Sequence, residues 1–371
     1  IFSLFPEDGS AMVNSLLATA DEIGEFSNAV LLSQDMTRCA AQARGLTHHV
    51  LADAYVRQLP NIDWTWALEQ MNRDLYKERN SAFHSHGIAH PFTHTLDLSC
   101  AAFCTALVAD ALGDKDLRDR VWECTSRWRN VYDSKTGILG ESRYYEGGAW
   151  NYSFRLLHDM AARIALHGGD TAFVRDLERF FGYGAPAAQQ QVDPSDHECM
   201  ARGFSLNRFE GFNNEPDMET PYAFIYAGHH ARTCEIVRAG MRHQFRLGRG
   251  GLPGNNDSGG LTSAYVWNAI GLFPVAGQSY MLIGSPVFEH VTIRLPQGEM
   301  RIAAEGTSSE ACYVGSATLN GKALDRAYLT MKEFLEGGEL RLRMCSNPSD
   351  WAKANRPPSY QRVEQLSRGD I

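Results

Sequence analysis

Three acidic residues lie in loops just before predicted helices, where carboxylates on separate elements can act together. These residues are Glu146, Glu215 and Asp257. Hydrolysis of a glycosidic bond with inversion needs one carboxylic acid that protonates the leaving oxygen and one carboxylate that activates water, set roughly 6.5 to 9.5 Å apart. Two carboxylates on separate loops suit that gap. The three residues are therefore candidates for general acid and general base catalysis.

Aromatic residues surround Glu146 in the sequence. Tyr144 and Tyr145 precede it, and Trp150 and Tyr152 follow it. Such neighbours can desolvate a carboxyl group and raise its pKa toward the value that a general acid needs. The N-terminus of the following helix acts in the opposite direction, so the sequence leaves the net shift open. The structural alternative is a carboxylate at a helix start that accepts backbone N–H groups.

The other two carboxylates lie in segments of different composition. Asp257 belongs to the glycine-rich segment 251–260, whose glycines let the backbone approach a ligand closely; an ordinary turn or capping aspartate is the alternative. Glu215 follows Asn214 in the segment 212–217, which is rich in the oxygen donors that calcium prefers. An Asn- and Asp-rich turn before proline is the alternative there. No single segment decides the chemistry.

The elements that must position these carboxylates are helical. From about residue 7 to 272 apolar residues recur at helical spacing, and roughly ten or eleven helices fit. Glycines such as Gly113 and Gly182 separate the helices by short turns. Stacked helical hairpins closed into a ring form an α/α toroid, in which the inner helices point their N-termini to one end. We expect this arrangement to bring the three carboxylates to a common mouth.

After Pro274 the pattern changes to alternating, β-branched segments. Strands are predicted at 287–295, 300–304, 312–319 and 339–344, with a turn at Asn320-Gly321. The chain is therefore expected to divide into a helical catalytic region at 1–275, a small antiparallel β element at 276–346 and an extended C-terminal tail at 347–371.

The order and spacing of three motifs resemble one enzyme family. The motifs are Tyr-Glu-Gly-x-Ala-Trp-x-Tyr at 145–152, Asn-Glu-Pro-Asp at 214–217 with Pro-Tyr shortly after, and Gly-x-Pro-Gly-Asn-x-Asp-x-Gly at 251–259. Further matching segments are 52–55, 272–275, 283–288 and 316–322. Together they make the chain, over about residues 5 to 352, similar to the catalytic domain of glycoside hydrolase family 92, whose members are calcium-dependent, inverting α-mannosidases.

The resemblance implies a fold and a set of roles. The fold is a mainly α, (α/α)6 toroid, here expected to be incomplete at its N-terminal end, with a small β element after it. By position, Glu146 corresponds to the general acid and Asp257 to the general base, while Asn214 and Glu215 correspond to the calcium region. Trp150, Tyr222 and His158 are candidate residues lining the sugar site, with ordinary core packing as the alternative. The implied activity is removal of terminal mannose from glycans, with α-1,2 linkages the commonest expectation.

The sequence also departs from the family pattern. Asn255 and Asn256 stand where the base loop usually carries a second acid, which leaves Asp257 as the only carboxylate of that loop. Two other interpretations therefore stay open. One is a degenerate protein that binds mannosides without cleaving them. The other is a different α/α-toroid carbohydrate enzyme, such as a glucoamylase-like hydrolase or a phosphorylase.

Composition narrows the class of partner. The 371 residues are 44% hydrophobic and carry a net charge of -9, so the chain is a globular domain without the basic surface that nucleic acids require. We expect no segment long and apolar enough to span a membrane. The eight cysteines form no CxxC pair, which indicates neither a zinc site nor a disulfide framework.

The compartment and the N-terminus are left open by the sequence. The chain begins Ile1-Phe2-Ser3 without Met or a signal-peptide pattern, so we expect residues to be missing before it, including the β-sandwich that precedes the toroid in the family. The family suggests a periplasmic or secreted protein, whereas unpaired cysteines suggest a cytoplasmic one.

Overall fold

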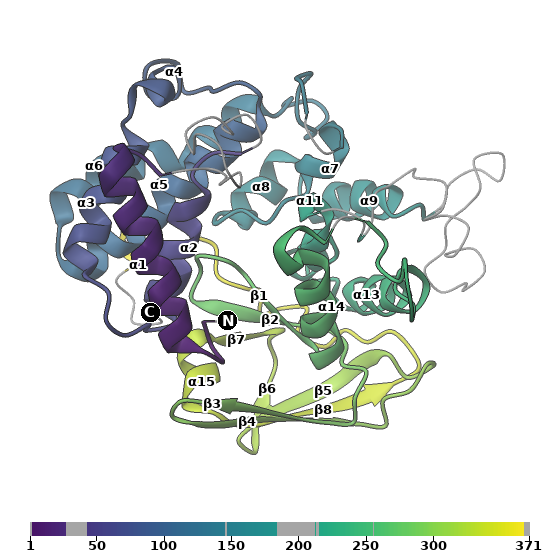
Figure 1. Ribbon diagram of the computed structural model, residues 1–371. Coiled ribbons are helices and arrows are strands. Elements are labelled where there is room, and N and C mark those ends of the chain that lie inside the picture. The colour runs from purple at the N-terminus through teal and green to yellow at the C-terminus, as the bar shows by residue number, and fades with distance from the viewer. Residues whose placement is uncertain are drawn as a thin grey trace.

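A computed structural model describes residues 2–26, 43–144, 147–183, 212, 215–254 and 256–366. Helices make up most of this part of the chain up to residue 270, and the strands lie together at the opposite end from α4 and α7 (Figure 1). The α-helices are α1 (Pro6–Ile23), α2 (Leu46–Val56), α3 (Trp64–Leu75), α4 (Ser81–His86), α5 (Thr93–Leu112), α6 (Lys115–Thr125), α7 (Ala149–Ser153), α8 (Met160–Leu166), α9 (Asp170–Phe180), α11 (Glu215–Met218), α12 (Ala223–Tyr226), α13 (His230–Gln244), α14 (Gly260–Ile270) and α15 (Met331–Glu336).

The helices begin and end at the residues that the sequence marks. Asp63, Asp114 and Asp159 each cap a helix N-terminus by accepting a backbone N–H of the first turn. Gly24 and Gly113 end α1 and α5 in the left-handed conformation, with φ of 86° and 80°. These local signals explain why short turns separate the helices.

Helices α2 and α5 pack side by side and run in the same direction. At one level Gly45, just before α2, faces Ala101 of α5 so closely that a methyl group on Gly45 would lie 2.6 Å from its Cβ. Further along, a methyl group on Gly277 would lie 2.9 Å from Sγ of Cys104 and 3.6 Å from Cβ of Ala52, so α2 and α5 are also close at this level. Parallel neighbours of this kind are what a toroid of helical hairpins requires of its inner helices.

One expectation about membranes was wrong. Among the described residues α5 is long and apolar enough to cross a bilayer, with a mean hydropathy of 1.5 over its most apolar window. However, 83% of that window is buried inside the protein. The helix is apolar all round because other elements cover it on every side, as expected for a core helix.

Strands follow the helices and form two sheets. The strands are β1 (Leu272–Pro274), β2 (Tyr280–Ile283), β3 (His290–Leu295), β4 (Gly298–Glu305), β5 (Tyr313–Leu319), β6 (Lys322–Leu324), β7 (Tyr328–Thr330) and β8 (Gly338–Cys345). The order is β1-β2-β7 in one sheet and β3-β4-β8-β5-β6 in the other. The predicted turn at Asn320-Gly321 joins β5 to β6, which pair as a hairpin.

The β element is mostly antiparallel, as expected, but β4 and β8 pair in parallel from Met300↔Gly338 to Glu305↔Arg343. Strand β8 enters the sheet only after β5, β6, β7 and α15, so the chain has room for the crossover that a parallel pair needs. Strand β1 also begins at Leu272, slightly before the predicted boundary.

The C-terminal segment after β8 returns to the helices. Arg356 pairs with Asp170 at the start of α9, with nitrogen–oxygen distances of 2.7 and 2.8 Å. The backbone N–H of Tyr360 donates to the carbonyl of His158 at 2.9 Å, and the ring of Tyr360 lies 5.1 Å from that of Phe103. The segment expected as an extended tail therefore packs on the helical region and ends in the short 3-10 helix η6 (Val363–Gln365).

Candidate active site

The starts of α7, α11 and α14 lie together. Glu215, expected in a loop before a helix, is instead the first residue of the short helix α11. The side chain of Asn151 in α7 donates to Asp217 of α11 at 3.0 Å. On the other side, a methyl group placed on Gly260 at the start of α14 would lie 3.3 Å from Oε1 of Glu215. Glu146, Asn214 and Asn255 lie outside the described residues, so their predicted roles stay predictions.

Helix α11 is held against α14 by apolar contacts. Met218 forms a small buried cluster with Leu261 and Ala264 on the first turns of α14. Because α11 contains only four residues, these contacts and the hydrogen bond from Asn151 to Asp217 hold the short helix that begins at Glu215. The sequence supplies the carboxylate, and packing sets its position.

The charge of Asp257 acts on Glu215. Burial raises the pKa of Glu215 above its ordinary value, a backbone hydrogen bond opposes this rise, and the negative charge of Asp257 adds to it. Asp257 itself is exposed at the start of the 3-10 helix η5 (Asp257–Gly259). An exposed carboxylate is open to water, and a half-buried one beside it favours a nearby positive charge.

The loop that carries Asp257 has a strained backbone. Asp257 and Ser258 have φ values of 30° and 53°, in the left-handed region of backbone conformation that residues other than glycine rarely adopt. Asn256 holds this conformation: its side-chain oxygen accepts from the backbone N–H and the hydroxyl of Thr262 at 3.0 and 2.9 Å. The main chain of Asn256 also accepts from Gly260 at 2.6 Å. Asn256 therefore holds the loop by hydrogen bonds, and it lies in the segment where the family usually carries a second acid.

A charged cluster lies next to these helices, and the sequence analysis did not identify it. Arg155, just after α7, donates to Asp97 of α5 at 2.7 Å, and its Nε lies 3.9 Å from Glu219, just after α11. Asp97 is buried, but 21% of the Arg155 side chain and 28% of the Glu219 side chain stay accessible. Burial raises the pKa of Glu219, while Arg155 opposes the rise. No local sequence motif predicts this cluster, because its members come from three segments that are far apart in the sequence.

The three predicted sugar-lining residues have different environments. Trp150 is half-buried, and Arg179 lies 5.7 Å from its ring centroid. Tyr222 is fully buried, stacks on Phe273 and donates to Asn268 at 2.7 Å. His158 is 2% exposed. These last two have the contacts of core residues, and a role in sugar binding stays a prediction for all three.

Burial also controls the charge of His158. It lowers the pKa of His158 to about 3, with His49 and Arg129 acting in the same direction. The ring stacks on Phe103 with centroids 4.7 Å apart. His158 is therefore a neutral core side chain at ordinary pH.

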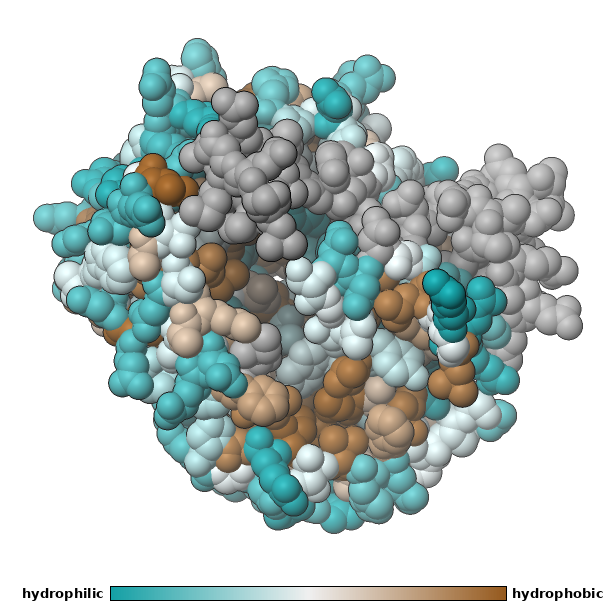
Figure 2. Space-filling view, in the orientation of Figure 1, coloured by the Kyte–Doolittle hydropathy of each residue, from teal (hydrophilic) through white to brown (hydrophobic). Residues whose placement is uncertain are grey.

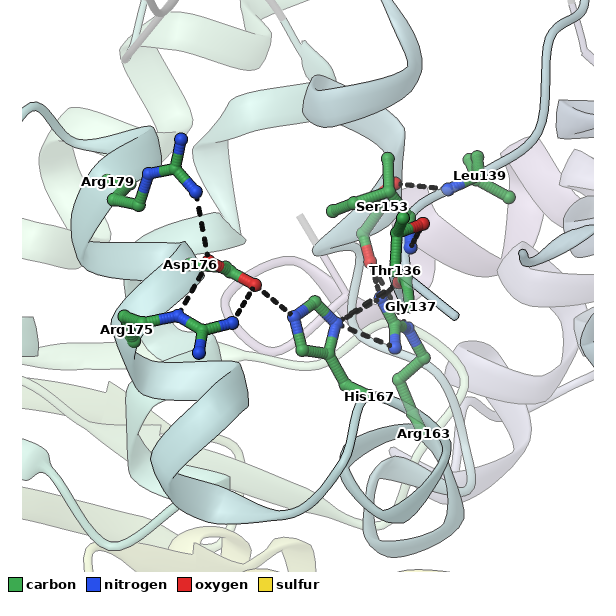
Figure 3. Close-up of polar contacts among 10 residues, drawn as sticks. Thr136, Gly137, Leu139, Ser153, Arg163, His167, Arg175, Asp176 and Arg179 are labelled. Carbon is green, nitrogen blue, oxygen red and sulfur yellow. Dashed lines mark hydrogen bonds and ion pairs between the residues drawn. The ribbon is translucent and has the colours of Figure 1, made fainter. Parts of the chain in front are cut away.

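A buried polar network supports the C-terminal end of α7 (Figure 3). Arg163, 0% exposed, donates to the carbonyl groups of Ser153 and Gly137 at 2.8 and 2.7 Å. Next to it, His167 lies 3.1 Å from the Gly137 carbonyl and 3.0 Å from Asp176. The network fixes the end of the short helix whose start follows the Glu146 loop.

Comparisons with known proteins establish the family of this chain. Residues 2–346 match the catalytic domain of glycosyl hydrolase family 92. The chain belongs to glycosyl hydrolase family 92. A secreted glycosidase from Arthroderma benhamiae is 26% identical over 381 residues, which cover 84% of this chain and 46% of the relative.

Solved structures of family 92 have the same fold. An inverting mannosidase from Bacteroides thetaiotaomicron is 24% identical, with a TM-score of 0.81 over 97% of this chain and 54% of its own. An α-mannosidase from the same organism, in complex with mannoimidazole, is 22% identical, with a TM-score of 0.84 over 98% of this chain and 51% of its own. These likenesses confirm the expected fold, a helical toroid followed by a β element. This family 92 chain spans about half the length of the relatives it matches.

The donor chemistry near Glu215 fits a hard cation in part. Its carboxylate is the ligand type that calcium prefers, and its raised pKa marks a place where a positive charge would be favourable. Within the described ranges, no three His, Cys, Asp or Glu side chains converge to hold a metal. Further oxygen ligands would therefore come from carbonyl groups, from Asn214 or from hydroxyl groups of the substrate.

Proposed function

We propose that this family 92 protein is an exo-acting α-mannosidase that hydrolyses its substrate with inversion. The observation that carries the proposal is the match to the family's catalytic domain over residues 2–346, together with the meeting of α7, α11 and α14. Mannosidases among the similar solved structures support the choice of sugar. Terminal α-1,2-linked mannose is the expected substrate.

The proposed mechanism assigns one proton transfer to each of two carboxyl groups. Glu146 donates a proton to the glycosidic oxygen as the bond to the anomeric carbon breaks. Asp257 accepts a proton from the water that attacks the opposite face of the sugar. The exposure of Asp257 supports this role, because water must reach it before the sugar binds. The left-handed backbone of its loop is held in place, so the carboxylate is oriented in advance.

Calcium is the proposed metal, held by Glu215 and Asn214. When bound it would polarise sugar hydroxyl groups and favour the flattened ring shape of an oxocarbenium-like transition state. The half-burial of Glu215 and the negative charge of Asp257 support a cation here. Both destabilise the charged form of the Glu215 carboxylate, and a bound cation would offset that cost.

The stereochemistry of the first product tests the proposal. Proton NMR taken before mutarotation should show β-mannose released from an α-mannoside. Glu146→Gln should lose activity on disaccharides but keep part of it on an activated aryl mannoside, which needs no proton on its leaving group. Asp257→Asn should lose activity on both. α-Mannose as the first product would require a nucleophilic carboxylate and would overturn the mechanism.

A further inference from the structure

A glycine inside α13 makes room for a phenylalanine close to the candidate metal ligand. Gly240 is buried within α13, and a Cβ at this position would lie within 2.8 Å of three atoms of the Phe212 ring. Protein interiors are close-packed, so any larger side chain at Gly240 would have to displace that ring. Glycine in a helix interior destabilises the helix relative to alanine. Its presence in α13 therefore indicates that Phe212 needs the space.

Phe212 has a backbone conformation that its own side chain disfavours. Its φ is 62°, in the left-handed region, and its side chain is 0% exposed. A bulky residue keeps such a conformation only where the surrounding structure enforces it. Figure 2 shows hydrophilic and hydrophobic residues side by side on the surface over α13 and α14, but the buried Phe212 ring is not part of that surface. Packing of the ring against α13 is therefore what holds the backbone at Phe212.

Helix α13 also holds the chain on the far side of α11. The hydroxyl of Thr233 donates to the carbonyl of Pro221, in the 3-10 helix η4 (Thr220–Tyr222), at 2.8 Å. Thr233 and Gly240 are seven residues apart, about two helical turns, so both lie on one face of α13. These two anchor points are about 10 Å apart along the helix axis, whereas the segment 212–221 could reach about 30 Å if extended. The segment therefore has length to spare, and the anchors limit the paths that it can take.

We propose that Phe212 and Gly240 form a positioning pair that sets the path of the chain into Glu215. Phe212 lies three residues before Glu215, and after Glu215 the contacts of Asp217 and Met218 hold α11. A site binds its ligand more weakly in proportion as its competent conformation is less populated. The inference rests on the proposed function, in which Glu215 binds calcium. Neither member of the pair is a proposed ligand, and both act through the backbone that leads to Glu215.

A substitution and its rescue test the positioning pair. Gly240→Ala should weaken the Kd for calcium about tenfold in calorimetry with calcium alone, because the added methyl group displaces the Phe212 ring and leaves about a tenth of the molecules competent. Adding Phe212→Leu to Gly240→Ala removes about as much volume as the methyl group adds, so the double variant should return to within about threefold of the unaltered protein. Leu17→Ala is the control for a general loss of stability, because Leu17 is 0% exposed on α1. This control should unfold more easily but keep its Kd for calcium.

Hydrogen exchange separates the positioning pair from the metal. Without calcium, the backbone amides from Phe212 to Tyr222 should exchange faster in Gly240→Ala than in Leu17→Ala, and the double variant should restore slow exchange. A Kd for calcium that is unchanged in Gly240→Ala, or that the double variant does not restore, would overturn the positioning pair and leave the calcium proposal standing. An unaltered protein that binds no calcium would overturn the calcium proposal, and the exchange rates would then decide for or against the positioning pair.

Discussion

Replacing Arg163 by methionine should destabilise the protein strongly, although Arg163 lies outside the candidate catalytic set. The guanidinium is 0% exposed and donates to the Ser153 and Gly137 carbonyl groups at 2.8 and 2.7 Å (Figure 3). It also lies 4.0 Å from the centroid of the Tyr132 ring. Methionine fills a similar volume but donates no hydrogen bond, so the variant isolates the loss of these polar contacts.

The magnitude follows from the groups left behind. Hydrogen bonds from a charged donor contribute about 1.5–3 kcal/mol each. Each carbonyl keeps a weaker contact in the variant: the His167 ring lies 3.1 Å from the Gly137 carbonyl, and the Tyr132 hydroxyl donates to the Ser153 carbonyl at 3.3 Å. Burial lowers the pKa of Arg163, which shows that the charged form is itself costly to bury, and methionine removes that cost. We therefore expect a net loss of about 3 kcal/mol in the free energy of unfolding.

Urea unfolding followed by circular dichroism measures this loss. Arg175→Met is the matched control, because Arg175 contacts Asp176 of the same network but 64% of its side chain is exposed. The control should be indistinguishable from the unaltered protein, since exposed ion pairs contribute little. A loss below about 1 kcal/mol in Arg163→Met would refute the reasoning that the hydrogen bonds of the buried guanidinium outweigh the cost of burying its charge.

Three further predictions concern pH, metal and the contact between helices. His158 has a pKa of about 3 in the folded protein, so below about pH 6.5 the unfolded chain binds a proton that the folded protein does not. The free energy of unfolding should therefore fall as the pH drops from about 6.5 toward 3. His158→Gln should flatten the pH dependence of urea midpoints in that window. EGTA should abolish mannoside hydrolysis reversibly, and Glu215→Gln should lose calcium binding in calorimetry, so full activity in excess chelator would contradict the metal proposal. Asn151→Ala removes a donor from buried Asp217 and should lower unfolding free energy by about 1–3 kcal/mol, whereas an unchanged urea midpoint would show that α7 and α11 do not depend on this contact.

Local patterns in the sequence were sufficient for most elements and for the family. Helix caps such as Asp63 and Asp114 act within a few residues, so their effect can be read without a structure. The same holds for the hairpin at Asn320-Gly321. The motifs around Glu215 and Asp257 identified the family because motif order and spacing are properties of the chain.

Contacts between distant segments decided the rest. The cluster of Arg155, Asp97 and Glu219 depends on three elements that meet only after the helices pack. Whether Tyr222 faces a ligand or the core depends on what covers it, and Phe273 does so from a strand 51 residues later. Apolar spacing defines a helix face but does not name the element that covers it, since burial is a property of packing between elements.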